Sequence, residues 1–400
     1  MENIKFEVLK KVAETSFKFR ELKNISKVDS ISPPSVFIGS KLKYPLVNVG
    51  ILSPLEKDEN AKLYDDEKYW AENNFDISDV IKLRNSLLNS RFQSKVQDSR
   101  LNKKFVNLAQ EIAIATKPVN VEIELKNKLS FKRERDRVIT PQGLRANLKQ
   151  AIITGNVKIS KKVDRVMNDE IKAVEGIKIL YKNNFDEYSL SKILSVGVIG
   201  LKKNKRLVPT RWSITATDDI IGKQLIEKIK EYKEIENYGL FFGEFLGNQY
   251  LILFFPNVWS YELFELYYPG SSWNSSKEIK AATDFEFYSG RKNYASNTSG
   301  GYYATRLAIL KYLNKIKRQA SVLVVRLETP SYWASLGVWV VRESVKKALN
   351  REMEFNSREE LINSAKKIAK IKYNFDFSFI LNKSLLLKKI KEEKRLQEWF

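Results

Sequence analysis

The stretch from Leu207 to Asp219 concentrates side chains that could do chemistry on a phosphate group. It contains one Arg, one Trp, four hydroxyl side chains and two adjacent carboxylates, Asp218 and Asp219. Arg and hydroxyl groups bind phosphate, and carboxylates hold divalent cations. The stretch therefore points to a phosphate-binding or metal-binding site. The alternative is a surface β-hairpin followed by a capped helix, with no chemistry.

The expected backbone would place these groups at the end of a strand. Apolar and hydroxyl side chains alternate from Trp212 to Thr217, which predicts a strand after a turn at Pro209. Asp218 and Asp219 would then cap a helix over residues 220–236. Five cations and no acid lie close by, namely Lys202, Lys203, Lys205, Arg206 and Arg211.

Two residue types that are missing from the composition exclude several kinds of site. The 400 residues include no Cys and no His, which excludes disulfides, thiol nucleophiles, a Ser-His-Asp triad and Cys/His zinc sites. Any bound metal would be Mg²⁺ or Mn²⁺ on oxygen ligands. The carboxylates expected to hold it, unless each only caps a helix or pairs with an Arg, are Asp218, Asp219, Glu244 and Glu262.

The chain is strongly basic. Seventy Lys and Arg against 48 Asp and Glu give a formal net charge of +22, which indicates a polyanionic partner, nucleic acid before an anionic membrane surface. No apolar run is long enough to span a membrane and the N-terminus does not resemble a signal peptide, so we expect a soluble, cytoplasmic protein. A second basic cluster, expected either to contact phosphates or to be a solvated surface, includes Arg133, Arg135 and Arg137.

Hydrophobic periodicity predicts an α+β fold, a compact body around an antiparallel or mixed sheet with flanking helices and a C-terminal helical tail. A paired hairpin of strands is expected over 36–38 and 46–49, and an exposed loop over 57–74. Helices are expected over 78–115, 158–181 and 302–318, and another from a capping box at Ser357. Further strands are expected over 119–125, 283–288 and 320–327, with a hairpin over 238–255 that turns at Gly247 and Asn248.

Two glycine-containing segments could hold phosphate ahead of the helix over 302–318. They are Gly290-Arg291-Lys292 and Gly300-Gly301. Ser32, Ser35 and Asn48 could meet a phosphate in the first hairpin, although a buried structural hairpin is the favoured interpretation there.

Several segments together resemble the archaeal Nre family of DNA repair proteins. The resemblance implies a role in DNA damage repair, an N-terminal family region over 1–270, a C-terminal region over 271–387 and a clamp-binding tail over 388–400. It implies no catalytic residues. The matching segments, in family order along the chain, are SPPSVFIG (32–39), YPLVNVG (44–50), LVPTRWSITATDD (207–219), GGYY (300–303), IKRQASVLV (316–324) and LGVWVVRE (336–343).

The chain departs from the family pattern at both ends. Many members carry a Cys-containing N-terminal segment of zinc-binding type, which has no counterpart here, so we expect no zinc. The family also ends in a peptide that binds the sliding clamp PCNA. Here Glu393 stands where that pattern has Gln, while Leu396, Trp399 and Phe400 fit. Two large aromatic side chains at a terminus are expected to be buried by a partner, or else to fold back on the protein's own core.

The leading hypothesis is therefore a DNA repair factor recruited by the clamp. Its DNA footprint, made of phosphate contacts, would be Arg133, Arg135, Arg137, Lys203, Lys205, Arg206 and Arg211. The rival is an enzyme, either a Mg²⁺- or Mn²⁺-dependent nuclease or nucleotide-processing enzyme using Asp218, Asp219 and Glu244, or a transferase acting on DNA through Arg211 and Ser213. A third hypothesis is a clamp adaptor without DNA affinity.

Overall fold

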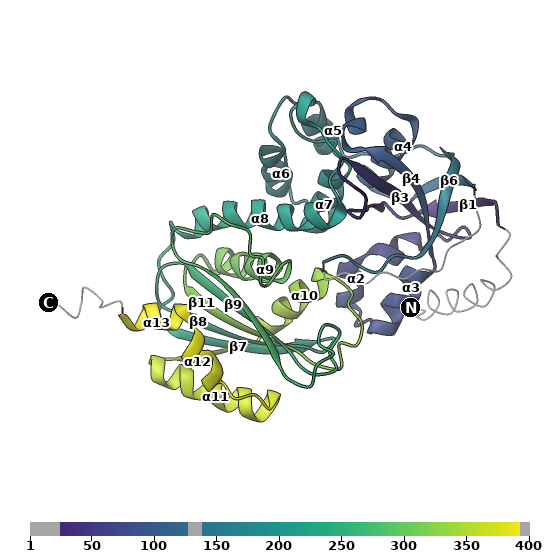
Figure 1. Ribbon diagram of the computed structural model, residues 1–400. Helices are drawn as coiled ribbons and strands as arrows, with labels where there is room; N and C mark the ends of the chain where they lie inside the picture. Colours follow the sequence, from purple (N-terminus) through teal and green to yellow (C-terminus); the bar gives the residue numbers. More distant parts are fainter. Residues whose placement is uncertain (1–24, 127–137, 393–400) are drawn as a thin grey trace. The chain divides into compact units, whose positions relative to one another are not determined.

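The structure is a computed structural model that describes residues 25–126 and 138–392 (Figure 1). The chain forms two compact units, residues 1–221 (unit 1) and 222–400 (unit 2). Each contains a six-stranded mixed sheet with helices, so the predicted α+β class is confirmed. Among the described helices, none combines the length and the apolar character needed to cross a membrane.

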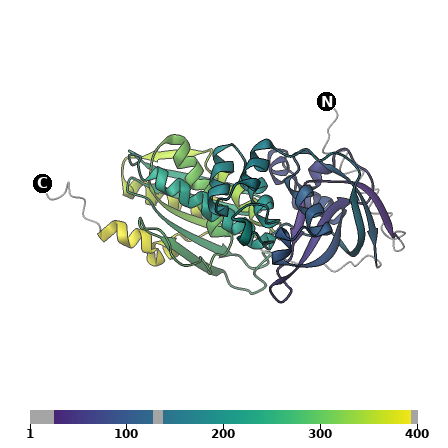
Figure 2. The ribbon, with the colours of Figure 1, turned by 90° about the horizontal axis from the view of Figure 1, so that it is seen from above.

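The sheet of unit 1 is mixed, because β4 and β6 run parallel while its other neighbouring strands run antiparallel. Figure 2 shows it from above, in purple to blue. The predicted pairing of 36–38 with 46–49 is confirmed, as is the strand over 119–125. In order across the sheet, the strands are β1 (Lys27–Ser32), β5 (Val119–Leu125), β6 (Leu144–Ile153), β4 (Leu87–Lys95), β3 (Leu46–Pro54) and β2 (Val36–Ile38).

Helices of unit 1 pack in a chain of pairs, α5 on α6, α6 on α7 and α7 on α4. Short 3-10 turns, η2 (Ala61–Asp65), η3 (Val96–Arg100) and η4 (Lys202–Asn204), connect the elements. The helices are α2 (Glu67–Glu72), α3 (Ile77–Asn85), α4 (Lys104–Ile114), α5 (Lys161–Asn168), α6 (Ala173–Lys182) and α7 (Glu187–Ser195).

The predictions for two segments between residues 57 and 115 are wrong. The helix expected over 78–115 is interrupted by β4, whose first four residues, Leu87 to Ser90, are all buried. A strand buried on both faces shows no alternation, and its run of Leu is equally suited to a helix. The segment 57–74 is not an exposed loop, because it folds into η2 and α2 and buries Tyr64 and Trp70 in the core.

The sheet of unit 2 is covered on both faces (Figure 1). Helices α9 (Gly301–Ile316) and α10 (Val338–Ala348) lie on one face, and α11 (Arg358–Tyr373), α12 (Ser378–Lys383) and α13 (Leu385–Glu392) pack on the other, in a core that joins strand residues to Leu361, Phe377 and Leu386. In order, the strands are β10 (Lys280–Glu286), β9 (Ser260–Tyr267), β11 (Ser321–Glu328), β8 (Asn248–Phe255), β7 (Tyr238–Phe245) and β12 (Glu352–Phe355), with β9 and β11 parallel.

The hairpin of β7 and β8 confirms a prediction with one adjustment. Its turn residues are Leu246 and Gly247, both at positive φ (50° and 74°), one position earlier than expected. Two positive φ angles match the twist of a two-residue hairpin. The predicted cap at Ser357 is also confirmed, since its side chain accepts the Glu360 backbone N–H at 3.2 Å.

The stretch from Leu207 to Asp219, called the central stretch below, is helical from Thr210 onward and contains no strand. Helix α8 (Thr210–Ile229) contains every residue from Trp212 to Asp219. Its buried positions, including Ser213, Thr217, Ile221 and Leu225, recur at helical spacing. The first turns of α8 bury small polar side chains instead of apolar ones. As a result, apolar and polar residues alternate in the sequence there as they would in a strand. The expected strand end at Asp218 and Asp219 therefore does not exist.

Candidate nucleic-acid interface

Three of the family-like segments converge at one place in unit 1, which we call the motif junction (Ile38, Pro45, Val96, Leu207 and Thr210). The backbone N–H of Ile38, in the segment 32–39, donates to Thr210 Oγ1 at 2.9 Å, across 172 positions of the chain. The backbone carbonyl of Pro45 accepts the Val96 N–H at 3.0 Å, and the Val96 carbonyl accepts the Leu207 N–H at 2.8 Å. Backbone groups thus fix segments that are distant in the sequence.

The start of α8 is secured from the other side as well. The Ser195 hydroxyl, at the end of α7, donates to the Val208 carbonyl at 2.8 Å, and the Val208 N–H donates to the Ser195 carbonyl at 2.8 Å. The Pro209 carbonyl accepts the first N–H groups of the helix, from Trp212 and Ser213. This anchoring fixes the direction in which the first turn of α8 presents its side chains.

Most hydroxyl groups of the central stretch are turned to the protein's own backbone. Ser213 Oγ donates to the Thr210 carbonyl at 3.0 Å, and Thr215 Oγ1 donates to the Arg211 carbonyl at 3.3 Å. Such bonds to the preceding turn are usual for Ser and Thr inside helices. In the first hairpin, Ser32 Oγ likewise donates to the Leu52 carbonyl. These hydroxyls serve the fold and are not directed toward a ligand.

Two aromatic side chains remain exposed at the motif junction. The rings of Tyr44 and Trp212 have centroids 6.3 Å apart and planes inclined by 36°. About half of each side chain is accessible, 52% for Tyr44 and 50% for Trp212. One ring comes from the segment 44–50 and the other from 207–219, so the pair exists only because the fold joins those segments.

The basic loop before α8 presents part of the predicted footprint. Lys203 and Arg206 are exposed. Lys205 is partly buried, its Nζ donates to the Met167 carbonyl at 2.6 Å, and burial lowers its pKa. Arg211 is half-buried. Arg133, Arg135 and Arg137 lie outside the described residues.

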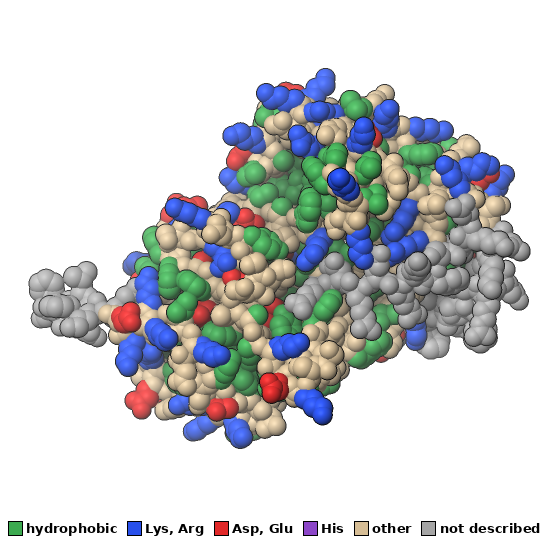
Figure 3. Space-filling view, in the orientation of Figure 1, with side chains coloured by type: hydrophobic (Ala, Val, Ile, Leu, Met, Phe, Trp, Pro, Cys, Tyr) green, Lys and Arg blue, Asp and Glu red, His purple; other side chains and the backbone are tan. Residues whose placement is uncertain are grey.

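The loop is held close to the end of α7. Gly197 has φ of 68°, and a Cβ there would overlap the backbone carbonyl of Arg206, so only Gly permits this approach. On the face of unit 1 drawn in Figure 3, Lys and Arg side chains are frequent and acidic side chains are few. The exposed cations Lys203 and Arg206 are therefore presented on a backbone that is fixed at Gly197 and Leu207.

The predicted carboxylate set does not gather in the described part of the chain. Within residues 25–126 and 138–392, no three acidic side chains are arranged to hold a metal ion. Asp218 is buried within α8 and Asp219 follows it on the same helix. Glu244 is exposed on β7 and accepts from Gln249 Nε2 at 3.1 Å.

Glu262 has a structural task in unit 2. Its carboxylate accepts the Ser384 hydroxyl and the backbone N–H groups of Leu385 and Leu386, both at 3.1 Å. It thereby caps the first turn of α13 from β9. Burial raises its pKa, although these donors oppose the shift. The interpretation of this carboxylate as a helix cap is confirmed.

The expected phosphate cradle at the start of α9 is filled by the protein itself. A Cβ at Gly301 would overlap Glu265 Oε1, so that carboxylate occupies the end of the helix. Asp284 Oδ2 accepts the Thr298 N–H at 2.9 Å, and Arg291 is bound to Asp284 Oδ1 at 2.7 Å. Helix N-termini attract anions, and here the anions are internal carboxylates.

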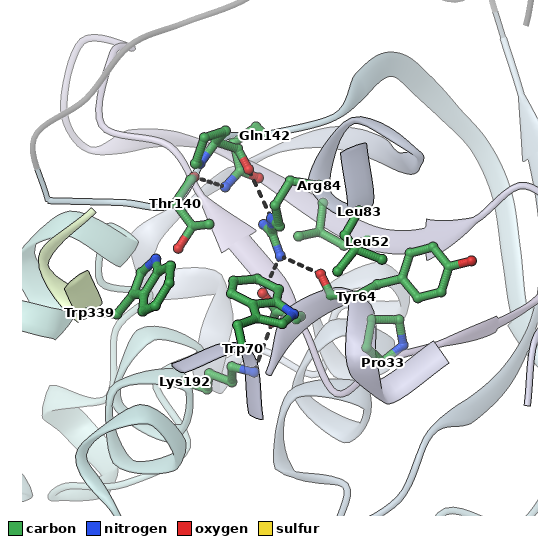
Figure 4. A network of polar contacts seen from close by, with 12 residues as sticks. Pro33, Leu52, Tyr64, Trp70, Leu83, Arg84, Thr140, Gln142, Lys192 and Trp339 are labelled. Carbon is green, nitrogen blue, oxygen red and sulfur yellow. Dashed lines mark hydrogen bonds and ion pairs between the residues drawn. The ribbon is translucent and has the colours of Figure 1, made fainter. Parts of the chain in front are cut away.

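A buried ion network in unit 1 escaped the sequence analysis (Figure 4). The Asp65 carboxylate pairs with Arg84 Nη1 through Oδ1 and with Lys192 Nζ at 2.9 Å through Oδ2. Burial raises the pKa of Asp65, but Lys192 and Arg84 lower it further, so it stays below its ordinary value. The partners are 19 and 127 positions from Asp65, so no local motif could reveal them.

The predicted clamp-binding residues, Glu393, Leu396, Trp399 and Phe400, lie outside the described residues. The described chain leads to them through α13, which ends at Glu392 and is tied to the sheet by the Glu262 cap. Leu386 and Leu387 of this helix are buried in the core of unit 2. The described chain therefore ends on a helix that is fixed to unit 2.

Comparison with known proteins places the chain among DNA repair proteins by similarity. The family descriptions "Archaeal Nre, N-terminal" and "Archaeal Nre, C-terminal" match residues 2–274 and 286–399. The chain is 41% identical over 354 residues to DNA repair protein NreA of Archaeoglobus fulgidus, covering 87% of this chain and 88% of that protein.

Two further relatives agree. DNA repair protein NreA of Haloferax volcanii is 39% identical over 326 residues, 80% of this chain and 77% of the relative. DNA repair protein NreB of Archaeoglobus fulgidus is 35% identical over 361 residues, 90% of this chain and 88% of the relative. No solved structure matches the chain.

Proposed function

The chain belongs to the archaeal Nre family, and on that premise we propose that it is a DNA repair factor which binds DNA through phosphate contacts and is recruited by the sliding clamp PCNA. The relatives' names support the repair role. The observation that carries the DNA contact is the exposed pair Lys203 and Arg206, held in a loop whose backbone is fixed at both ends.

Phosphate contacts predict a particular salt dependence. Each phosphate neutralised by a cation contributes about 0.9 to the slope of log Kobs against log salt on duplex DNA. If Lys203 and Arg206 each meet one phosphate, the double variant Lys203→Glu/Arg206→Glu lowers the magnitude of that slope by about 1.8. The measurement is fluorescence anisotropy of a labelled duplex across a salt series, with the full chain.

A matched control separates a local footprint from bulk charge. Lys366 and Lys367 are exposed on α11 in unit 2, and the variant Lys366→Glu/Lys367→Glu changes the net charge equally. We expect this control to keep the wild-type slope. Equal weakening by both double variants would mean that only the net charge of +22 attracts DNA, and the proposed footprint would be wrong.

The proposal of clamp recruitment rests on the sequence of residues 393–400. In the proposed complex Leu396, Trp399 and Phe400 fill one hydrophobic pocket, the arrangement of short peptides that dock through a few anchors. Calorimetry with the clamp compares the full chain with a chain that ends at Arg395, and we expect binding to be lost on truncation. Glu393→Gln should bind more tightly than the native chain, because an amide donates hydrogen bonds that a carboxylate cannot. Equal clamp affinity of the full and truncated chains contradicts the proposal.

A further inference from the structure

We infer that the Tyr44–Trp212 ring pair is a stacking site for an unpaired DNA base. This deepens the proposed function, on which it rests: beyond phosphate contact, the protein would bind DNA whose bases are exposed, as in a single strand or an extruded nucleotide. The site is formed by two exposed aromatic side chains on a fixed backbone, bordered by cations.

The geometry of the pair suits a base on its outer surface. A centroid distance of 6.3 Å with a tilt of 36° lies within the range for aromatic rings in mutual contact. A base cannot enter between rings already in contact, so it would lie on the outer face of one ring. Half of each side chain is accessible for that contact.

The rings are held in place by the motif junction. Pro45, next to Tyr44, is bonded through Val96 to Leu207, and Trp212 lies in the first turn of α8. The Trp212 N–H donates to the Pro209 carbonyl at 2.8 Å. A stacking platform that is already ordered loses little conformational freedom when a ligand binds.

Exposed cations lie on the segments that carry the two rings and on the neighbouring strand β4. Lys43 is exposed next to Tyr44, and Lys95, also exposed, lies opposite Leu46 across β3 and β4. Exposed Arg206 precedes Leu207, the residue bonded to Val96. The nearby acid Asp98 accepts the Ser94 hydroxyl at 2.9 Å and the Lys95 N–H at 3.0 Å.

This combination favours nucleic acid over a protein partner. Pro45 and Leu46 are exposed beside the rings and would suit an apolar protein surface as well. The exposed cations on the adjoining segments favour nucleic acid, because sites for single-stranded nucleic acid combine aromatic platforms with positive charge along the backbone. A base inside a duplex is covered by its neighbours, so the ligand must be unpaired.

The test compares two single-stranded oligonucleotides, oligothymidylate and the same backbone with abasic sites, by fluorescence anisotropy with the full chain. Stacking of one base on the Trp212 ring predicts that Trp212→Ala weakens binding to oligothymidylate by about 5- to 140-fold. Tyr44→Ala should weaken it less, because that change removes only the ring packed against Trp212. The salt slope should stay at the wild-type value, because the phosphate contacts remain. On the abasic strand, wild type and Trp212→Ala should bind alike.

Two further variants complete the design. Trp333 in unit 2 is similarly exposed, at 53%, so Trp333→Ala is the matched control and should bind both strands like wild type. Trp212→Phe keeps a ring and should recover most of the affinity, which distinguishes stacking from damage to the fold.

The failures of the two proposals are distinguishable. If wild type binds neither strand in a salt-dependent manner, the proposed function itself is wrong. If salt-dependent binding persists but Trp212→Ala and Trp333→Ala are equivalent on oligothymidylate, only the stacking site is refuted. Conversion of an oligomer to a monomer by Trp212→Ala, seen by analytical ultracentrifugation, would assign the rings to a protein contact and likewise overturn the inference.

Discussion

The buried ion network of unit 1 gives the sharpest stability prediction. Asp65 is the shared acceptor for two cations, and its carboxylate also accepts the Ser35 hydroxyl. The substitution Asp65→Asn keeps the size of the side chain but removes its charge. Arg84 and Lys192 are then left without their common counterion.

The two cations should contribute unequally to the stability that is lost on Asp65→Asn. The Arg84 side chain is 2% exposed and keeps only neutral acceptors, the Pro141 carbonyl at 2.9 Å and the Tyr64 carbonyl at 3.5 Å. Lys192 is 25% exposed and can regain water. Removing one partner of a buried pair costs about 3–5 kcal/mol. Since the amide oxygen introduced by the substitution would still accept one hydrogen bond, we expect a loss of about 3 kcal/mol.

Hydrogen exchange in the full chain can localise this loss to unit 1. A single global unfolding free energy is poorly defined for a chain of two units, so the measurement follows peptides from α3 and β4. A loss of about 3 kcal/mol corresponds to roughly 140-fold faster exchange through opening of the unit. Peptides from the unit 2 sheet report whether the effect remains local.

An ion pair on the surface provides the control. A variant that removes only one of the two cations tests whether Arg84 depends on Asp65. Glu124 pairs with Lys149 at 2.8 Å with side chains 27% and 58% exposed, so Glu124→Gln should cost much less than Asp65→Asn, because exposed ion pairs contribute little. Lys192→Met should also cost less than Asp65→Asn, because Arg84 keeps its counterion. Exchange in Asp65→Asn as slow as in Glu124→Gln would refute the claim that Arg84 depends on this carboxylate.

Three other predictions concern single side chains. Burial and the neighbouring Asp65 raise the pKa of Glu67 to about 7. The contribution of this group to the stability of the folded state is therefore complete below pH 4.5, its ordinary pKa, and is lost as the pH rises through about 7. Hydrogen exchange of unit 1 peptides at pH 5.5 and 8, corrected for the intrinsic exchange rate, should therefore show Glu67→Gln gaining stability over wild type at both values, and more at the higher pH. Gly301→Ala should cost about 1–3 kcal/mol, measured as faster hydrogen exchange in peptides of the unit 2 sheet, since Arg326 and Tyr267 hold the Glu265 carboxylate that the new methyl group would meet; unchanged exchange there contradicts this. Glu262→Ala should release the first turn of α13, with exchange over 385–392 rising by about tenfold or more for the loss of the cap, and unchanged protection there would mean that the core contacts alone hold the helix.

Elements with clear alternation or a clear turn signal could be predicted from the sequence, and elements without either could not. Strand β5 follows from its alternation, and the hairpin of β7 and β8 follows from the turn between two apolar runs. Helix α8 was missed because Ser213 and Thr217 fill buried positions where an apolar side chain is expected. Strand β4 was missed because burial on both faces removes the alternation.

For the site, residue type predicted the kind of chemistry but not the orientation of the groups. Lys203 and Arg206 are exposed as a phosphate footprint requires. Glu262 and the start of α9 were candidate ligand sites, yet their charges are used within unit 2. Whether a carboxylate meets a ligand or a helix end depends on tertiary neighbours far away in the chain, as with Glu262 and Leu386, 124 positions apart, and a single sequence does not contain that information.

Some side chains at the motif junction are buried or hydrogen-bonded within the protein, and others are exposed. This contrast favours ligand binding over catalysis as the role of the junction. The Ser213 and Thr215 hydroxyls of α8 are bonded to the preceding turn, and Asp218 is buried, so using them on a substrate would require the helix start to open. That opening would break the bonds from Ile38 to Thr210 and from Leu207 to Val96. The groups presented without any rearrangement are rings and cations, which attract bases and phosphates. This arrangement is the one that the proposed DNA binding requires, since it needs no opening of the helix start.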